Sequence, residues 1–121
     1  MKQKKKSYPI RLKDYQRFAI WIAADSMMCV TNLPDHEYEA LRRICDQCEP
    51  LDGSPDSAVI TFTPHQLHSS VKSIELALRY LSGSEQPYGP SFYDHDYESE
   101  LRESVSDFEQ LLPFFRSILS S

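Results

Sequence analysis

The sequence predicts a mainly α-helical protein, a compact bundle of four to five helices with a small two-stranded sheet formed by residues 8–12 and 58–62. Apolar residues recur at three- and four-residue spacing over most of the chain, as in helices that pack on a core. Only two short segments have the alternation or the β-branched content of strands. Because 121 residues suffice for one core, we expect a basic arm over residues 1–7 and a single globular domain over residues 8–121.

The first strand and the first helix follow the basic arm. Tyr8, Ile10 and Leu12 alternate with exposed-type residues, which predicts a strand. A helix is then predicted from about residue 14 to residue 31. Its centre, residues 18–24, is apolar on every side, so we expect this helix to be buried centrally or at an interface.

A second helix is predicted to start at residues 33–35, where Pro34 suits the first turn and Asp35 suits the positive end of the helix dipole. Glu39 and Arg43 are spaced to form a favourable pair on its outer side. Pro50 ends the helix and begins a polar loop. Its apolar face consists of Tyr38, Leu41, Ile44, Cys45 and Cys48.

The third helix has the clearest boundaries. After the second strand, Thr63 and Gln66 form a predicted capping box with Pro64 at the first helical position. Gly83 is suited to end the helix. One face of this helix carries Leu67, Val71, Ile74, Leu78 and Leu81.

The C-terminal part is predicted to be a loop over residues 82–93 and one long helix from about Asp96 almost to the end. Pro113 should bend this helix without breaking it, because the apolar stripe stays in phase across the proline. Such a stripe can pack within one bundle or pair with a second copy, so a homo-oligomer is compatible with it. The stripe consists of Leu101, Val105, Phe108, Leu112, Phe115 and Leu119.

A short internal repeat is present at the two strand-to-helix junctions. Residues 10–16 and residues 60–66 share the pattern I-x-(L/F)-x-x-(Y/H)-Q, and each copy precedes two helices. A weakly duplicated strand–helix–helix unit would place the two strands together as a small sheet against the helices. Seven positions are few, and coincidence explains them equally well.

Charge is distributed unevenly along the chain. Seven Lys and Arg residues against Asp14 give residues 1–17 a net charge of +6, and since the whole chain carries −5, the remainder carries −11. An acidic body repels phosphate backbones, so nucleic acid is not expected as a partner except through the lysine arm, Lys2–Lys6. That arm is also typical of a solvated terminus.

The three cysteines and the absence of a long apolar run indicate a cytoplasmic protein. An odd number of cysteines in a chain of this length fits a reducing compartment. The longest apolar stretch, residues 18–30, contains Asp25 and is shorter than the roughly 20 residues of a membrane span. No membrane span is therefore expected.

A zinc site is a weak alternative suggested by Cys45 and Cys48 followed by His65 and His68. The spacing departs from that of zinc fingers, and the cysteines continue an apolar helix face whereas the histidines lie on a polar one. A redox role is disfavoured because the cysteine pair lies near a helix C-terminus, where the dipole opposes a thiolate. We therefore expect no metal and no cofactor.

An acidic and aromatic segment near the C-terminal third is the candidate partner-binding surface. Seven acidic residues but only one basic residue, Arg102, lie between Asp94 and Glu109. Acidic residues at a helix start also cap backbone amides, and most acidic runs are solvated faces. Aromatic side chains beside the acids favour docking of a partner with a basic surface. The candidate residues are Tyr88, Phe92, Tyr93, Asp94, Asp96, Tyr97, Glu98, Glu100, Glu103 and Asp107.

The sequence contains no pattern typical of an active site, so we expect a protein that is not an enzyme. Gly-rich phosphate loops are excluded because only three glycines are present, Gly53, Gly83 and Gly89, whereas such a loop needs two or three within a few residues. No serine nucleophile motif occurs. The leading hypothesis is a small acidic protein-binding regulator, an adaptor or stoichiometric inhibitor, similar in size and charge to immunity proteins and anti-defence inhibitors. The alternative is a metal- or nucleic-acid-associated regulator that uses the Cys/His set or the lysine arm.

Overall fold

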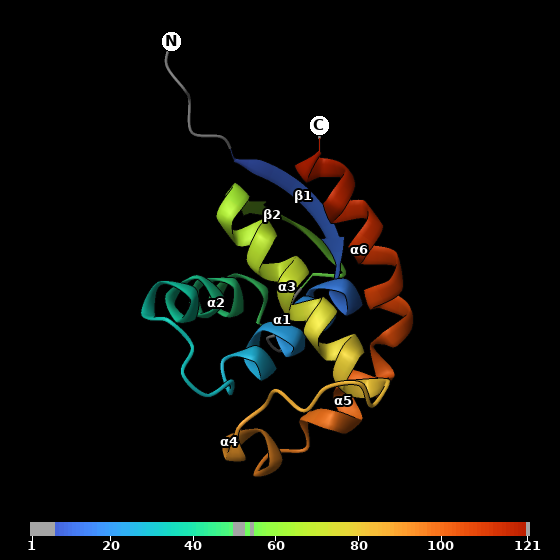
Figure 1. Ribbon diagram of the computed structural model, residues 1–121. Coiled ribbons are helices and arrows are strands. Elements are labelled where there is room, and N and C mark those ends of the chain that lie inside the picture. Colours follow the sequence, from blue (N-terminus) through green and yellow to red (C-terminus); the bar gives the residue numbers. More distant parts are fainter. Residues whose placement is uncertain (1–6, 50–52, 54, 121) are drawn as a thin grey trace.

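The computed structural model describes residues 7–49, 53 and 55–120. It confirms the mainly α-helical fold, with six helices and a two-stranded antiparallel sheet in the described part of the chain (Figure 1). Residues 1–6 of the predicted basic arm lie outside the described residues. In chain order the elements are β1 (Tyr8–Lys13), α1 (Asp14–Met27), α2 (Asp35–Cys48), β2 (Ser57–Phe62), α3 (Pro64–Leu81), α4 (Pro90–Tyr93), α5 (Tyr97–Glu103) and α6 (Val105–Leu119).

Helix α1 is at the centre of the fold. It packs against β1, α2, α3, α5 and α6, and Figure 1 shows α1 and α3 between α2 on one side and α6 on the other. Five of its apolar side chains, Ala19, Ile20, Ile22, Ala23 and Ala24, have no exposed surface. Central burial within one chain therefore accounts for most of the apolar character of this segment, with Phe18 and Trp21 partly buried on the remaining side. Among the described residues, none of the helices combines the length and the apolar character that a membrane crossing requires.

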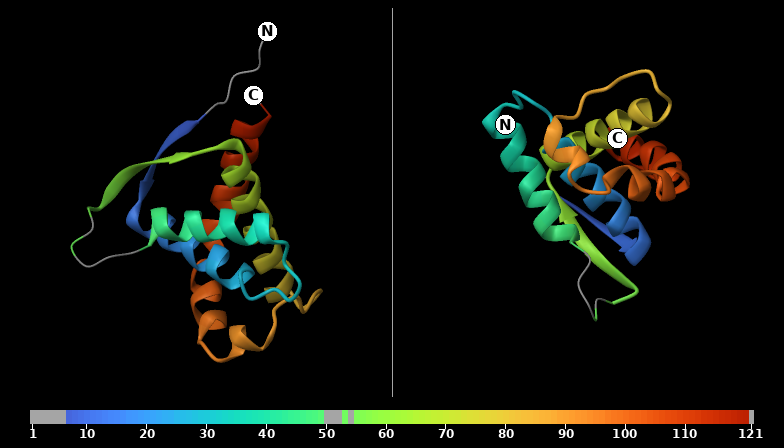
Figure 2. Two further views of the ribbon diagram at one scale, coloured as in Figure 1. Left: turned by 90° about the vertical axis from the view of Figure 1, so that its left-hand side faces the viewer. Right: turned by 90° about the horizontal axis from the view of Figure 1, so that it is seen from below.

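The sheet joins the two copies of the sequence repeat. Strands β1 and β2 lie side by side (Figure 2). In their antiparallel register Ile10 lies opposite Ile60, the residue at the same position in the other copy. Both junctions use a glutamine in the same way. The backbone N–H of Lys13 donates to Gln16 Oε1 at 2.8 Å, and that of Thr63 donates to Gln66 Oε1 at 2.9 Å.

The capping box predicted for α3 is confirmed, because the N–H of Gln66 also donates to Thr63 Oγ1 at 3.1 Å. The outer pair predicted on α2 is present as well, with Arg43 Nε 3.6 Å from Glu39 Oε2. Glu39 lies closer to Arg42, at 2.5 Å, so the two arginines share one carboxylate. The start of α3 and the ion pair on the outer side of α2 therefore follow from interactions between residues close in the sequence, as predicted.

The prediction that the first helix reaches residue 31 is wrong, since α1 ends at Met27. The segment after it is held by a different part of the chain. Val30 forms an isolated bridge with Tyr88, and the N–H of Gly89 donates to the carbonyl of Cys29 at 2.8 Å. The segment of Cys29 and Val30 thus pairs with residues 88 and 89, and α1 does not continue through it.

The prediction of one long C-terminal helix is also wrong, because the chain breaks at Ser104 into α5 and α6. Pro113 lies inside α6 and does not end it. Because proline has no N–H to donate, the carbonyl of Glu109, four residues earlier, has no helical donor. Glu109 faces solvent, so water can hydrogen-bond to that carbonyl. The predicted loop over residues 82–93 contains the short helix α4.

The apolar stripe of α5 and α6 packs within the monomer. Leu101, Phe108, Leu112 and Phe115 are buried, and α6 contacts both α3 and α1. Phe115 packs against Phe62 of β2 with ring centroids 5.7 Å apart. A second copy is therefore not needed to cover the stripe.

We predict that Gly89→Ala destabilises the fold. A Cβ atom at this position would lie 2.9 Å from the carbonyl oxygen of Cys29 and 2.9 Å from Thr31 Oγ1. The first of these is backbone that the Gly89–Cys29 hydrogen bond holds in place, so we expect a loss of about 1–3 kcal/mol in the free energy of unfolding. Urea denaturation measures the free energy of unfolding, with Ser99→Ala at an exposed position as the control. Equal stability of Gly89→Ala and wild type would contradict the close packing of Gly89 against Cys29 and Thr31.

Candidate functional site

Carboxylates of α5 and its flanking turns form the candidate site. We define the acidic face as Asp94, Asp96, Glu100 and Glu103. None of these four carboxylates makes a hydrogen bond or an ion pair with another residue in the described ranges. Asp107 follows in the first turn of α6 and is likewise not paired with a described residue. The face therefore carries negative charge that no described residue neutralises by a hydrogen bond or an ion pair.

Mutual repulsion is evident at Glu100, which lies on the inner side of the acidic face. Partial burial raises the pKa of its carboxyl group, and the charges of Asp96, Glu103 and Asp25 raise it further, whereas His95 lowers it. Burial also raises the pKa of Asp107. A cation placed here would relieve these unfavourable interactions.

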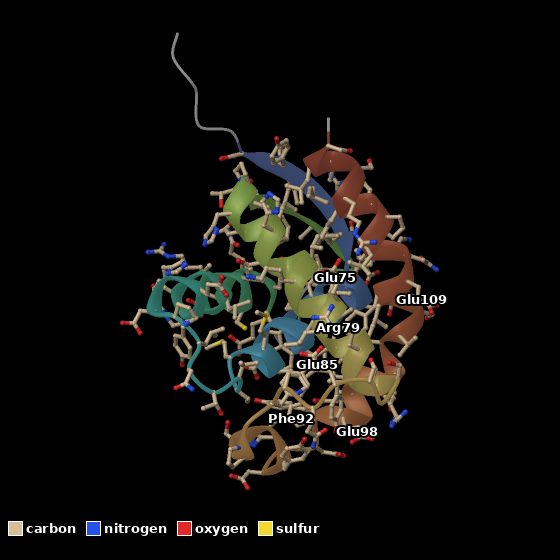
Figure 3. All side chains as sticks on the ribbon, in the orientation of Figure 1. Glu75, Arg79, Glu85, Phe92, Glu98 and Glu109 are labelled. Carbon is tan, nitrogen blue, oxygen red and sulfur yellow. The ribbon has the colours of Figure 1, made fainter. Side chains whose placement is uncertain are left out.

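Glu98, in contrast, is neutralised within the chain. It accepts hydrogen bonds from the hydroxyl of Tyr80 at 2.6 Å and from Arg102 at 2.7 Å. Both contacts lower the pKa of its carboxyl group, and the hydrogen bond from Tyr80 has the larger effect. Figure 3 shows Glu98 near Phe92 at the end of the molecule formed by α4 and α5. Glu98 therefore belongs to the fold rather than to the unneutralised face.

Two of the predicted aromatic contact residues are buried. Tyr88 and Phe92 are only 5% and 1% exposed, and their rings stack with centroids 4.2 Å apart. Tyr80 packs edge-on against both. Their side chains cannot contact a partner in this conformation, because almost none of their surface is exposed, and the bridge between Tyr88 and Val30 holds this segment beside the end of α1. They are therefore removed from the candidate surface.

The other two predicted aromatics differ in exposure. Tyr97 is partly buried, and its hydroxyl donates to Asp25 Oδ2 at 2.6 Å, which ties α5 to α1. Tyr93 is 50% exposed and packs its ring against Phe92, with centroids 5.0 Å apart. Its hydroxyl accepts a hydrogen bond from Gln86. Tyr93 is thus an ordered aromatic side chain at the edge of the acidic face.

The side chains of Asp94 and Asp96 do not cap the N-termini of α4 and α5, although the sequence allowed such a role. Asp96 is the N-cap residue of α5, but its side chain forms no capping hydrogen bond. Asp94 follows the end of α4, and Gly89 is the N-cap residue of that helix. These aspartates therefore remain available to a partner.

The structure separates the cysteines from the histidines of the alternative zinc set. Cys48 is fully buried, and Cys45 Sγ lies 3.8 Å from Met28 Sδ, whereas His65 and His68 are exposed. Burial raises the pKa of both thiols, that of Cys48 to about 12. Within the described ranges, no three His, Cys, Asp or Glu side chains are grouped so as to hold a metal ion.

His65 instead stacks with His36 of α2, with ring centroids 6.4 Å apart. The two rings lie beside a shallow hollow of about 300 Å³ that Glu39, Arg43 and Gln66 also line. The second alternative, a lysine arm that binds nucleic acid, falls on Lys2–Lys6 outside the described residues.

Sequence reasoning missed a second hollow, which lies between the end of α1, the middle of α3 and the loop that follows α3. Its lining residues come from three separate segments of the chain, so no local sequence pattern predicts the hollow. The one available signal was the seven-residue spacing of Lys72 and Arg79, which places two cations on the same side of α3.

No protein-family model, no curated protein and no solved structure matches the chain. Its function must therefore be inferred from the residues and the geometry described above.

Glu100→Gln should stabilise the protein at pH 7. The folded state holds the Glu100 carboxyl with a pKa above its ordinary value of 4.5, so the ionised group opposes folding at neutral pH. We expect a gain below about 1 kcal/mol, because the side chain is only partly buried and solvent screens its charge. The gain should shrink as the pH falls from the raised pKa towards 4.5 and then vanish.

Urea denaturation of wild type and variant between pH 7 and pH 4 measures this difference. Glu98→Gln is the matched control, since the pKa of Glu98 is lowered and its neutralisation should destabilise the protein at pH 7. A Glu100→Gln variant less stable than wild type at neutral pH would contradict the electrostatic description of the acidic face.

Proposed function

We propose that the protein is a small, non-catalytic regulator, an adaptor or stoichiometric inhibitor, that docks a larger protein with a basic surface through its acidic face. One observation carries the proposal: Asp94, Asp96, Glu100 and Glu103 are gathered on one short stretch of chain without a cation among the described residues to neutralise them. Like charges at close range cost free energy in the unbound protein. A basic partner would recover that free energy on binding.

Charge of this kind acts mainly on the rate and the specificity of association. A basic partner is attracted over distances of about one Debye length, roughly 8–10 Å at physiological salt. The remainder of the chain after residue 17 carries a net charge of −11, so the long-range field has the same sign as the acidic face. Binding through this face should therefore weaken as the salt concentration rises.

Tyr93 supplies the apolar component that a charged surface alone lacks. Its ring is half exposed but is fixed by contact with Phe92 and by the hydrogen bond from Gln86. A tyrosine held in place loses little side-chain entropy on binding, which is why such residues recur as interface hot spots. We place Tyr93 at the edge of the docking surface.

The three cysteines agree with a reducing, cytoplasmic setting for this function. Cys29, Cys45 and Cys48 are all free thiols in the structure. In an oxidising compartment a free thiol is open to disulfide exchange, whereas cytosolic reductants keep it reduced. We therefore include cytoplasmic location in the proposal.

The test is quantitative affinity capture from a lysate of the natural host with a tagged protein, at low and at high salt. We expect one dominant, near-stoichiometric partner that high salt releases. A fourfold variant, Asp94→Asn, Asp96→Asn, Glu100→Gln and Glu103→Gln, should lose that partner, because the attractive charges are gone. Tyr93→Ala should weaken capture by about tenfold, as for loss of one hot-spot side chain.

The matched control neutralises four acids elsewhere on the surface and changes the net charge by the same amount: Asp35→Asn, Asp46→Asn, Glu49→Gln and Asp56→Asn. It should retain the partner at low salt. Full capture by the acidic-face variant, or equal losses in the two fourfold variants, would show that the acidic face is not the docking surface.

A further inference from the structure

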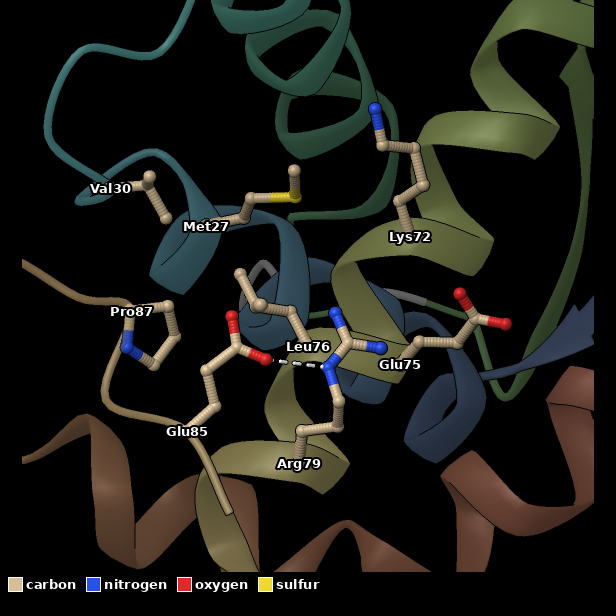
Figure 4. A pocket seen from close by; sticks show the side chains of 8 residues that line it. All are labelled: Met27, Val30, Lys72, Glu75, Leu76, Arg79, Glu85 and Pro87. Carbon is tan, nitrogen blue, oxygen red and sulfur yellow. Dashed lines mark hydrogen bonds and ion pairs between the residues drawn. The ribbon is translucent and has the colours of Figure 1, made fainter. Parts of the chain in front are cut away.

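A partly enclosed hollow of about 250 Å³ lies between α1, α3 and the loop that follows α3 (Figure 4), and it shares no lining residue with the acidic face. Its floor is apolar and is formed by Met27, Val30, Leu76 and Pro87. Charged side chains of Lys72, Glu75, Arg79 and Glu85 stand around it. An apolar floor with a few charged groups at the mouth is the usual composition of a small-molecule site, and the volume lies just below the range of about 300–1,000 Å³ of drug-sized pockets, so it suits a smaller ligand.

The walls of the hollow are fixed by the fold. Val30 is held by its bridge to Tyr88, and the backbone bond between Gly89 and Cys29 fixes the loop against the end of α1. Met27 and Leu76 are only 7% and 8% exposed, so their side chains are packed from behind. The hollow is therefore largely pre-formed, which lowers the entropic cost of filling it.

Arg79 determines which ligand the hollow can attract. Its Nε donates to Glu85 Oε1 at 2.8 Å, and its terminal nitrogens make no hydrogen bond or ion pair with any other described residue. Figure 4 shows the guanidinium over the apolar floor, with Glu85 reaching it from the loop. Two donors in a fixed fork are thus left for a second acceptor, and a carboxylate matches that fork.

Two of the four charged residues of the hollow, Glu75 and Lys72, are paired with residues outside its lining. Glu75 is paired with Arg116, outside the hollow. Lys72, two turns before Arg79 on the same helix, lies 2.8 Å from Glu37 and stands at the far side of the mouth. Glu75 and Lys72 are thus each paired with a residue that does not line the hollow, whereas Arg79 and Glu85 pair within it and the terminal nitrogens of Arg79 have no described partner.

We propose that this hollow binds a small carboxylate with an apolar tail, whose tail covers Leu76 and Val30 and whose carboxylate accepts hydrogen bonds from the terminal nitrogens of Arg79. Glu85 is then an internal competitor, because its carboxylate shares the guanidinium with that of the ligand. The exposed pair between Arg79 and Glu85 is of the kind that contributes little to stability, so a ligand can displace Glu85 at low cost. Removing the Glu85 charge should strengthen binding.

The probes are 4-phenylbutyrate and 4-phenylbutylamine, which share the apolar part and differ in the sign of the charge. Titration of the full chain, followed by amide chemical shifts, should show saturable changes at Met27, Val30, Leu76 and Arg79 with the carboxylate and not with the amine. Arg79→Gln should weaken carboxylate binding by about tenfold or more, the value of one charge-assisted contact. Glu85→Gln should strengthen it several-fold.

Glu75→Gln is the matched control, since it removes the same charge from the same hollow without touching Arg79, and it should change the affinity much less than Glu85→Gln. Arg79 and Glu85 are both exposed, so these variants should fold, and their circular dichroism spectra check that they do. Preference for the amine, equal affinities of Arg79→Gln and wild type, or the absence of saturable shifts at the hollow would overturn the proposal.

Discussion

Burial of α1 is the constraint on which the rest of the structure depends. A helix that is apolar on every side cannot lie on a surface, so each of its faces must be covered by another element. In this chain β1, α2, α3, α5 and α6 all contact it. Alanines at positions 19, 23 and 24 have no exposed surface and allow the neighbouring backbones to approach closely. The sheet, the paired helices and the C-terminal stripe are arranged around that requirement.

The two candidate binding regions lie where this central packing ends. The last turn of α1 supplies Met27 to the hollow, and the segment after it is held by the loop that carries Glu85 and Pro87. Asp25, near the same end of α1, accepts the hydrogen bond from Tyr97 that fixes α5, and α5 presents the acidic face outward. One end of the central helix thus positions both the acidic face, which we propose as the docking surface, and a small apolar hollow.

Features encoded by neighbouring residues could be predicted from the sequence. The capping box of Thr63 and Gln66 is local chemistry, and the two strands were recognisable by composition, so both were found near their observed positions. The repeat drew attention to Gln16 and Gln66, which make the same hydrogen bond at the two strand-to-helix junctions. The paired register of Ile10 and Ile60 is what a duplicated unit would produce.

Features that depend on distant segments could not be predicted in the same way. The early end of α1 depends on pairing with Tyr88 and Gly89, some sixty residues later in the chain. The break at buried Ser104 falls within an apolar periodicity that is continuous across residues 101–108, so the periodicity does not mark it. Composition alone could not tell that Tyr88 and Phe92 turn inward while Tyr93 stays outside. Of the acids that the local pattern identified, Glu98 is paired with Arg102, and the others have no cationic partner among the described residues.

Native-state hydrogen exchange tests the central role of α1 most directly. If the packing of this helix holds the fold together, the amides of residues 20–24 should exchange only through global unfolding, with the highest free energy of opening in the molecule. The amides of α4 and α5 should open locally at lower free energy, because those short helices lie at the periphery. Exchange of residues 20–24 through local opening, while the amides of α2 or α6 remain protected, would contradict the account.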